Sequence, residues 1–555
     1  MFVFRRRFNL NKVANYFLQG GTISRTESTN HYVESVVCKE NDLKENEMKV
    51  FDIGEEGKVL LVKQKGEFSA VGTKCTHYGA PLVTGALGDG RVRCPWHGAC
   101  FNLKTGDIED FPGFDSLPCY QVTVTEKGEV KLKTNKRSKD MGSRAPCDDT
   151  SVVIIGGGPS GATCAETLRG EGFKGRITIV AKENYLPYDR IKISKITTPT
   201  DIEKLQVRNQ EYYTDANIDI LKGVEATKLE PQTKVVHLSN GKKLPYSTVY
   251  IATGCKPRVP DVPGIDLKNI FTVRNYEDSV NILKALGSDK DKNVVVLGLS
   301  FIGLEAAASC TQAAKSMTVV GKDTEPLGLI FGPEIGKSLR KLFEEKNVQF
   351  HFETTITKCN GENGMITSVE LANGATLPAD LLILGVGSTF YTDFLKDSGI
   401  AMRPNGAVIV SDKLETNIKN VYAGGDIAYA PVFAHNNEQM AIGHIGLSQY
   451  HGKVAGLNIL KKETQLKTVP YFWTMLFGKS IRYAGCGKPF STQIEGDIDA
   501  LKFVIFFFDK SDKVIAVASC MRDPVVSQFA ELVYQGKSLY KKDLKDDPFA
   551  WTKSC

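Results

Sequence analysis

The sequence predicts a multidomain chain: a small all-β domain, two α/β domains with parallel sheets, and a small α+β domain at the C-terminus. Short β-like runs separated by glycine turns occupy residues 35–134. From about residue 150, strand-like runs are followed by helical ones, and this unit occurs twice in the chain. The 555 residues suffice for roughly three to five domains or subdomains.

Composition excludes several classes of protein. Hydrophobic residues make up 42% and charged residues 24%, a globular balance that argues against a largely disordered or fibrous chain. No apolar run reaches the roughly 18 residues that would cross a membrane, so we expect no membrane span. The 70 basic residues are offset by 64 acidic ones without a basic stripe, so no nucleic-acid partner is expected. Thirteen scattered cysteines do not form a secreted disulfide framework and suit an intracellular protein.

The N-terminal segment, residues 1–34, is basic. Its first 26 residues contain Arg5, Arg6, Arg7, Lys12 and Arg25 and no acid. Such a segment is typical of an organelle transit peptide, and a disordered basic tail is the alternative. The expected compartment is therefore the cytoplasm or the mitochondrion. Residues 135–149, rich in Lys, Arg, Ser and Asp, are predicted to be a linker.

Two segments of the all-β region each carry one cysteine and one histidine. Cys75 and His77 form the first pair, and Cys94 and His97 form the second, with 16 residues between the pairs. Zinc is the competing interpretation, but zinc sites usually pair Cys with Cys and His with His. A Rieske [2Fe–2S] centre needs two thiolates on one iron and two imidazoles on the other. The mixed pairs favour the iron–sulfur centre.

Residues 75–98 resemble the Rieske ferredoxin family, and the resemblance covers residues 35–134. It implies an all-β Rieske domain with four cluster ligands: Cys75, His77, Cys94 and His97. High-potential relatives add a loop disulfide and hydroxyl groups near the cluster. This chain has no extra cysteine pair there, and it has Ala99 and Phe101 at the hydroxyl positions. Because such hydrogen bonds stabilise the reduced cluster, we expect a low potential, about −150 mV.

Two glycine loops each follow a strand and open a helix, the context in which such loops hold a pyrophosphate. Near the end of the strand that follows the first loop, Glu183 is placed to bind ribose hydroxyls. In the second loop Ser300 replaces the middle glycine, and its Cβ limits the approach of a pyrophosphate. After that loop, Asp323 would favour NADH and Lys322 would tolerate NADPH, so this choice stays open. The candidate loop residues are Gly156, Gly158, Ser160 and Gly161, then Gly298, Ser300 and Gly303.

Two later motifs complete a recognisable set. Ala252 and Gly254 belong to an Ala-Thr-Gly stretch, and Asp426 ends an Ala-Gly-Gly-Asp stretch. With the two loops they resemble the two-dinucleotide flavoproteins of the pyridine nucleotide-disulfide reductase class, over residues 150–465. The resemblance implies Rossmann-like domains, FAD on the first loop, NAD(P)H on the second, and Asp426 at the ribityl–phosphate part of the flavin. No cysteine lies between Cys164 and Cys255, which excludes the dithiol mechanism of that class.

The segment 186–195 resembles that of oxygenase-coupled ferredoxin reductases and apoptosis-inducing factor. The resemblance implies that Arg190 contacts the FAD phosphates and that Lys195 lies near the flavin. A cation there stabilises an anionic reduced flavin. Glu305 is either a group near the nicotinamide or an ordinary acid at a helix start. Trp473 either stacks near the flavin or packs in a core.

A Rieske domain followed by a flavin reductase resembles apoptosis-inducing-factor-like proteins with an N-terminal Rieske domain. The expected boundaries are 35–134 for the Rieske domain, 150–268 and 393–465 for the FAD domain, 269–392 for the NAD(P) domain and 466–555 for the C-terminal domain. The predicted function is an NAD(P)H-dependent oxidoreductase that passes electrons through FAD to its own cluster and then to an unknown acceptor.

One alternative function remains: a redox-responsive interaction protein with slow turnover, as the family resemblance implies. A nitrite-reductase-like assembly is set aside, because the cysteines of the C-terminal third are too widely spaced for its cluster. The sequence specifies neither the electron acceptor nor the oligomeric state.

Overall fold

The computed structural model describes residues 34–54, 57–135, 149–195 and 200–554. The predicted basic segment 1–34, except its last residue, lies outside the described residues, as does most of the predicted linker 135–149.

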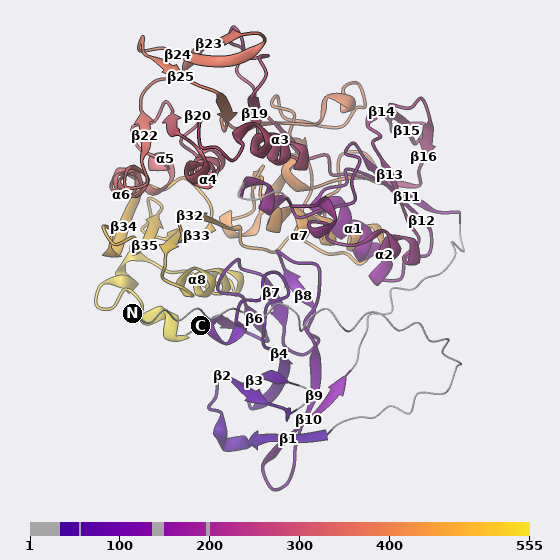
Figure 1. Ribbon diagram of the computed structural model, residues 1–555. Coiled ribbons are helices and arrows are strands. Elements are labelled where there is room, and N and C mark those ends of the chain that lie inside the picture. The colour runs from indigo at the N-terminus through magenta and orange to yellow at the C-terminus, as the bar shows by residue number, and fades with distance from the viewer. Residues whose placement is uncertain (1–33, 55–56, 136–148, 196–199, 555) are drawn as a thin grey trace, which may run out of the picture.

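Two antiparallel sheets form the all-β domain, at the bottom of Figure 1. In β3 (Lys58–Gln64), the four consecutive apolar residues from Val59 to Val62 are buried. This pattern is typical of a strand that is covered on both faces. The larger sheet has the order β1 (Glu34–Lys39), β10 (Glu129–Asn135), β9 (Cys119–Val124), β4 (Glu67–Gly72), β3 (Lys58–Gln64) and β2 (Glu47–Asp52). The smaller has β5 (Ala86–Gly88), β6 (Arg91–Arg93), β7 (Cys100–Asn102) and β8 (Ile108–Asp110).

The first α/β unit is a five-stranded parallel sheet with α1 (Pro159–Gly170) after its central strand. An antiparallel three-stranded sheet, β14 (Ala226–Glu230), β15 (Val235–Leu238) and β16 (Lys243–Pro245), is inserted before its fourth strand. The parallel order is β13 (Ile218–Lys222), β12 (Arg176–Ala181), β11 (Ser151–Ile155), β17 (Thr248–Ile251) and β29 (Val421–Ala423).

The second unit repeats this architecture, which confirms the predicted internal repeat. Its parallel order is β22 (Val348–His351), β21 (Ser316–Val320), β20 (Asn293–Leu297), β26 (Leu381–Leu384) and β19 (Ile270–Thr272). It too has an inserted antiparallel sheet, β23 (Ile356–Glu362), β24 (Met365–Leu371) and β25 (Thr376–Pro378). The two sheets differ in where the edge strand next to the fourth strand comes from. In the second unit this strand, β19, comes before the other four strands in the chain, whereas in the first unit it is β29, which comes after them.

The helix after the second glycine loop starts in the loop itself. It spans Phe301–Cys310 as α4, and a 3-10 turn covers Thr311–Ala313. The helix begins directly after Ser300 because it starts in the glycine loop, as α1 does in the first unit. Its end tightens into the 3-10 form that is common at helix termini.

The C-terminal domain is α+β, as predicted. Its antiparallel sheet packs against α8 (Val525–Tyr534), and α8 also lies against β5 and β6 of the all-β domain (Figure 1). The sheet order is β32 (Tyr471–Leu476), β33 (Lys479–Gly485), β36 (Val514–Cys520), β35 (Lys502–Phe508) and β34 (Ser491–Asp497).

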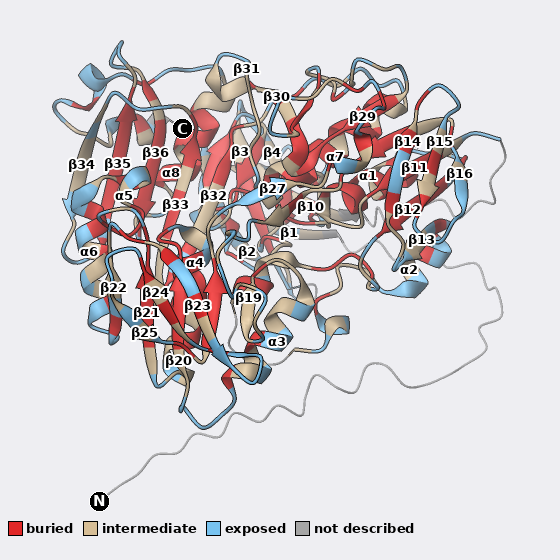
Figure 2. Ribbon diagram, turned by 90° about the horizontal axis from the view of Figure 1, so that it is seen from above, coloured by how far each residue is buried: buried red, intermediate tan, exposed pale blue. Residues whose placement is uncertain are grey.

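The remaining α-helices are α2 (Gln210–Asp215), α3 (Tyr276–Leu286), α5 (Gly328–Phe331), α6 (Pro333–Glu344) and α7 (Ile445–Ile459). The 15-residue α7 packs along α1. Buried residues concentrate in the central strands and in α1, α4, α7 and α8 (Figure 2). No helix in the described part of the chain is long and apolar enough to span a bilayer.

A two-stranded sheet lies where the chain passes between the two α/β units, with β18 (Cys255–Pro257) antiparallel to β27 (Ser388–Phe390). A separate three-stranded sheet contains β28 (Val408–Ile409), β30 (Ala428–Val432) and β31 (Glu438–Met440).

Candidate functional site

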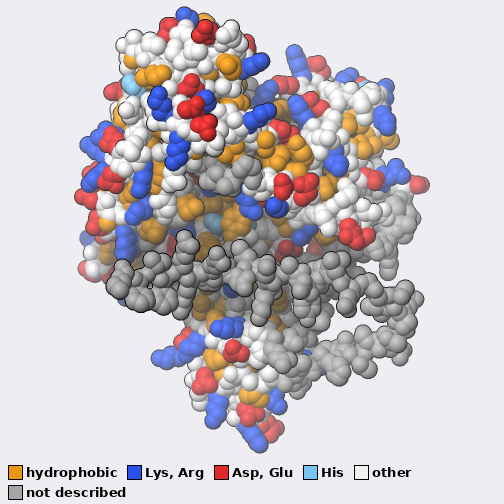
Figure 3. All heavy atoms as spheres, viewed as in Figure 1, with side chains coloured by type: hydrophobic (Ala, Val, Ile, Leu, Met, Phe, Trp, Pro, Cys, Tyr) orange, Lys and Arg blue, Asp and Glu red, His pale blue; other side chains and the backbone are white. Residues whose placement is uncertain are grey.

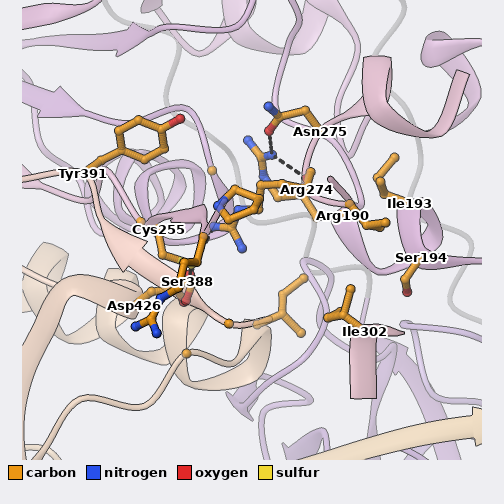
Figure 4. A pocket seen from close by; sticks show the side chains of 18 of the residues that line it. Arg190, Ile193, Ser194, Cys255, Arg274, Asn275, Ile302, Ser388, Tyr391 and Asp426 are labelled. Atoms are coloured by element: carbon orange, nitrogen blue, oxygen red, sulfur yellow. Dashed lines mark hydrogen bonds and ion pairs between the residues drawn. The ribbon is translucent and has the colours of Figure 1, made fainter. Parts of the chain in front are cut away.

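A cavity of about 1470 Å³ opens at the carboxyl ends of both parallel sheets, where open α/β sheets bind their ligands. Figure 4 shows the side chains that project into it from both units. Most predicted binding residues line it: Gly156, Gly158, Ser160, Glu183, Arg190, Lys195, Ala252, Gly254, Gly298, Ser300, Glu305, Asp323 and Asp426. Gly161 and Gly303 do not line it and lie behind the loops.

The first and last glycines of each loop are required by backbone packing. Gly156 has φ +126°, and a Cβ there would lie 2.2 Å from the Ala252 carbonyl oxygen. A Cβ on Gly161 would lie 2.0 Å from the Gly156 carbonyl oxygen, and one on Gly303 would lie 2.2 Å from that of Gly298. The two loops are therefore built alike. At the middle position of the first loop, a Cβ on Gly158 would meet no backbone atom and would lie 4.0 Å from Arg190 Nε, so this position faces the cavity where a pyrophosphate would lie.

Glu183 and Arg190 form an ion pair at the edge of the cavity. Arg190 also donates to the Asn275 side chain at 3.1 Å, as Figure 4 shows. The Tyr188 hydroxyl donates to Glu183 at 2.5 Å. The structure thus brings together the acid predicted for a ribose and the cation predicted for a phosphate.

Asp426 lies at the centre of a second polar cluster. Its carboxylate pairs with Arg274 at 3.1 Å and accepts hydrogen bonds from Ser448 at 3.0 Å and from the Cys255 thiol at 3.3 Å. Burial acts to raise the pKa of Asp426, but the Arg274 guanidinium and these hydrogen bonds outweigh it and hold the pKa below its ordinary value. Asp426 therefore stays ionised at neutral pH.

Lys195 and Glu305 meet inside the cavity although they are 110 positions apart. The Lys195 ammonium lies 2.6 Å from Glu305, and the Thr474 hydroxyl donates to the other carboxylate oxygen at 2.7 Å. Ser194 donates to Glu305 as well. Glu305 is 7% exposed and lies within α4, so it is not an ordinary surface acid at a helix start.

Two tight turns of the all-β domain hold the Cys–His pairs. The Gly79 amide donates to the Cys75 carbonyl at 2.9 Å, and the Cys94 amide donates to the Ala99 carbonyl at 2.7 Å. The Nδ1 atoms of His77 and His97 are 3.1 Å apart. The Cys75 and Cys94 thiols share a hydrogen bond, which raises the pKa of Cys75 and lowers that of Cys94. The structure thus brings sulfur to sulfur and imidazole to imidazole.

This pairing fits a binuclear cluster. In the described residues no three His, Cys, Asp or Glu side chains are gathered closely enough to hold one metal ion. Two thiols and two imidazoles, each facing its own kind, instead match a centre in which one iron takes both sulfurs and the other takes both nitrogens. Burial, the largest cause, lowers the pKa of His77 to about 4 and that of His97 to about 2, so both rings are neutral donors.

Trp473 lies between the cavity and the imidazole pair. Its ring lines the cavity, and its centroid is 4.4 Å from that of His97 and 6.0 Å from that of His77. The His444 ring packs edge-on to it at 4.9 Å. Of the two sequence interpretations of Trp473, the geometry favours the one at the cavity. In the hollow at the middle of the face in Figure 3, hydrophobic side chains gather around a histidine.

Comparison with protein-family models gives two matches. Residues 150–441 match the model of pyridine nucleotide-disulphide oxidoreductases, and residues 33–121 match that of the Rieske [2Fe-2S] domain. The chain belongs to the pyridine nucleotide-disulphide oxidoreductase family. Members of this family are FAD-dependent NAD(P)H oxidoreductases, and this one carries a Rieske [2Fe–2S] domain at its N-terminal side.

Individual relatives agree with this assignment. The chain is 40% identical over 526 residues to apoptosis-inducing factor 3 of Homo sapiens, covering 92% of this chain and 86% of the human protein. It is 30% identical over 335 residues to the benzene 1,2-dioxygenase system ferredoxin–NAD(+) reductase subunit of Pseudomonas putida, covering 60% and 80%. A ferredoxin reductase structure from Rhodopseudomonas palustris superposes with a TM-score of 0.69 at 24% identity, over 73% of this chain and all of that one, which supports the fold.

In this oxidoreductase a buried ionic cluster joins the Rieske domain to the C-terminal domain. No sequence motif predicted it. Arg93 lies 2.6 Å from Glu531 of α8 and 2.8 Å from Asp110. Arg91 lies 3.3 Å from Asp110, and all four side chains are at most 5% exposed. Thr468 donates to Asp110 at 2.7 Å. Two cations and two anions balance, which is the condition for burying charge.

Sequence reasoning missed Arg274 and Arg482 of this oxidoreductase. Arg274 pairs with Asp426, and Arg482 donates from β33 to the Trp96 carbonyl at 2.8 Å. Neither residue belongs to a motif, and both act across long sequence separations. The only signal for Arg482 was an arginine at the centre of a strand in the C-terminal domain.

Proposed function

We propose that the chain passes electrons from NAD(P)H through FAD to its own Rieske cluster and from there to an external acceptor. The observation that carries this proposal is the position of Trp473, which lines the dinucleotide cavity and packs 4.4 Å from His97 between ring centroids. FAD supplies the conversion of a two-electron donor into single electrons, and the cluster stores one electron at a time.

We assign each cofactor to the part of the chain whose residues fit it. FAD is held by the first glycine loop, with Glu183, Arg190 and Asp426, in domain 150–268 plus 393–465. NAD(P)H is held by the second loop and Asp323 in domain 269–392. The cluster is held by domain 35–134, through Cys75, His77, Cys94 and His97. The 3.1 Å separation of the two imidazole Nδ1 atoms supports this ligand set.

The cavity residues then have distinct tasks. Lys195 presents a positive charge at a site where negative charge develops on reduction, and Glu305 fixes the position of that charge at 2.6 Å. Thr474, one residue after Trp473, holds Glu305 from the C-terminal domain at 2.7 Å. The three domains therefore contribute to one site, and Phe472 and Trp473 close its wall against water.

An anaerobic titration of the full chain with NADH, and separately with NADPH, tests the proposal. Visible spectra report flavin reduction, and EPR spectra report the cluster. We expect flavin bleaching followed by a Rieske-type signal. Trp473→Leu is expected to slow the appearance of that signal about tenfold or more without slowing flavin bleaching, since the close-packed ring between the two centres is lost.

Phe472→Leu is the matched control, because it changes the same cavity wall without a ring contact to His97. Equal slowing in both variants would show that Trp473 acts only as packing. Flavin bleaching with no iron signal, or zinc found by elemental analysis, would remove the cluster from the path and leave the redox-responsive interaction protein as the better description.

A further inference from the structure

Arg482 connects the C-terminal domain to the cluster loop. It lies on β33, is 6% exposed, and its Nε donates to the Trp96 carbonyl oxygen at 2.8 Å. Trp96 stands between Cys94 and His97, one proposed ligand on each side. In the sheet, Arg482 of β33 lies opposite Trp473 of β32. It therefore lies where the C-terminal domain meets the Rieske domain.

The guanidinium of Arg482 is held next to both proposed ligands of this loop. Its hydrogen bond goes to the carbonyl of Trp96, which is two positions along the chain from Cys94 and one from His97. A buried cation favours the more negative state of a centre bound beside it.

Asp523 is the counter-ion of Arg482. Its carboxylate lies 3.0 Å from Arg482 Nη1, and its side chain is 30% exposed, whereas that of Arg482 is 7% exposed. Arg482 therefore touches the loop directly, and Asp523 acts from the solvent side. The Arg482–Asp523 pair is separate from the ionic cluster of Arg91, Arg93, Asp110 and Glu531, whose ion pairs involve neither residue.

We propose that Arg482 and Asp523 of the C-terminal domain set the reduction potential of the Rieske cluster from outside the Rieske domain. The inference rests on the proposed function, because it takes Cys94 and His97 as cluster ligands. Reduction adds one negative charge to the cluster, which a buried guanidinium stabilises and a carboxylate opposes. Arg482 thus raises the potential that the loop would have by itself, and Asp523 lowers it.

The test is a redox titration of the full chain at pH 8, followed by EPR of the cluster. Burial raises the pKa of Asp523 to about 6, so pH 8 keeps this carboxylate ionised. Arg482→Gln is expected to shift the cluster midpoint to a lower potential. Asp523→Asn is expected to shift it to a higher one, and Arg482→Lys is expected to retain most of the wild-type value because the charge remains.

Arg522→Gln is the matched control, since it removes the same charge one residue from Asp523, from a guanidinium that packs over Phe549 at 5.3 Å. It is expected to leave the midpoint unchanged. Flavin midpoints and thermal unfolding of each variant show whether the fold is intact. Opposite shifts in Arg482→Gln and Asp523→Asn support the proposal, because mere loosening of the loop would move both in the same direction.

Shifts of the same sign, or no shift in either variant, would overturn the role of the pair. Absence of any Rieske signal in the unmodified chain is a different result. It would contradict the cluster assignment on which the proposed function depends. This result comes from the unmodified chain alone, so it is distinguishable from a failure of the Arg482–Asp523 proposal.

Discussion

His444 is the partly buried N-cap residue of α7, His451 is buried at the middle of that helix, and both act as hydrogen-bond acceptors. The Gly446 amide donates to His444 Nδ1 at 3.3 Å, and the Gly425 amide donates to His451 Nδ1 at 3.2 Å. A protonated imidazole has no free acceptor nitrogen, so these bonds require neutral rings. Burial lowers the pKa of each to about 4, against the partial opposition of Asp426.

The stability of the reductase is therefore predicted to fall as pH drops from about 6.5 toward 4. In that range the unfolded chain gains protons on these histidines and the folded chain does not, so stability rises with pH. The folded pKa of about 4 for His451 makes its contribution about 2 kcal/mol between pH 7 and pH 5. Urea unfolding of the holoprotein at both pH values should show a smaller loss in His451→Gln, whose amide oxygen keeps the acceptor.

His435→Gln is the comparison, since that ring is 24% exposed and pairs with Glu438 at the surface. An unchanged pH dependence in His451→Gln would mean that other groups control acid stability.

Single residues were predictable where chemistry restricts the residue type and its local spacing. The two Cys–His pairs were predictable from a stretch of only 23 residues, and the structure brings all four side chains together. The contact between Lys195 and Glu305 was not predictable as a pair, because it depends on packing α4 against the segment after β12. Arg274 and Arg482 belonged to no local motif, since Arg274 meets Asp426 and Arg482 meets Trp96 across more than 100 positions.

The glycine loops illustrate what a βαβ unit requires of its sequence. In each loop the first and last glycines are fixed by backbone contacts within the protein, whereas the middle position faces the cavity. This difference explains why Ser300 is compatible with the fold although it narrows the approach to the second loop. The repeat was visible in sequence because these constraints recur in both units.

Two substitutions in the second loop are predicted to have opposite effects. Gly303→Ala places a Cβ 2.2 Å from the Gly298 carbonyl oxygen, so it should abolish reduction by NAD(P)H while leaving bound FAD in place. Ser300→Gly removes a Cβ from the pyrophosphate side, so it should lower the KM for the nucleotide several-fold at unchanged kcat. Steady-state kinetics and flavin content measure both.

Gly161→Ala gives the reciprocal control, with a Cβ 2.0 Å from the Gly156 carbonyl oxygen in the first loop. Gly161→Ala should lose bound FAD, whereas Gly303→Ala should retain it. Loss of FAD from Gly303→Ala would contradict the assignment of separate cofactors to the two loops.

Glycine marks both boundaries of β4, which begins directly after Gly66 and ends at Gly72. The start of α4 was less predictable, because Phe301 and Ile302 resemble the strand before them more than a helix. Their helical state is set by the loop geometry and not by residue preference.

The whole molecule is held together by contacts between domains that are distant in sequence. Tyr78 bonds to Asp189, Gln449 Nε2 donates to the Gly113 carbonyl at 2.8 Å, and Ser527 donates to the Cys94 carbonyl at 2.9 Å. Together with the ionic cluster at Arg93, these bonds join the Rieske domain to the rest of the chain. The relative placement of the domains was not predictable from sequence, because Arg91 and Arg93 look like ordinary polar residues of a short strand.

Glu531→Leu is predicted to destabilise this arrangement by about 3–5 kcal/mol, since it leaves Arg93 buried with one of its two anions gone. Hydrogen exchange of β6 and β7 should rise in the holoprotein, and the thermal transition should fall. Glu415→Leu, which removes an acid bonded to Tyr422 within one domain, is the comparison. Unchanged exchange in β6 would show that the cluster does not hold the Rieske domain in place.

The ionic cluster also limits how this architecture can be rearranged. Three of its four charges, on Arg91, Arg93 and Asp110, come from residues before 135 and the fourth, on Glu531, comes from near the C-terminus, so neither part of the chain is electrically complete without the other. Grafted onto a reductase that lacks an acid at the position of Glu531, this Rieske domain would bring two guanidinium groups to a surface with one carboxylate fewer than they need. The domain is therefore not an interchangeable electron-transfer module, and an exchange of one half between relatives would have to carry the matching acid or arginine with it.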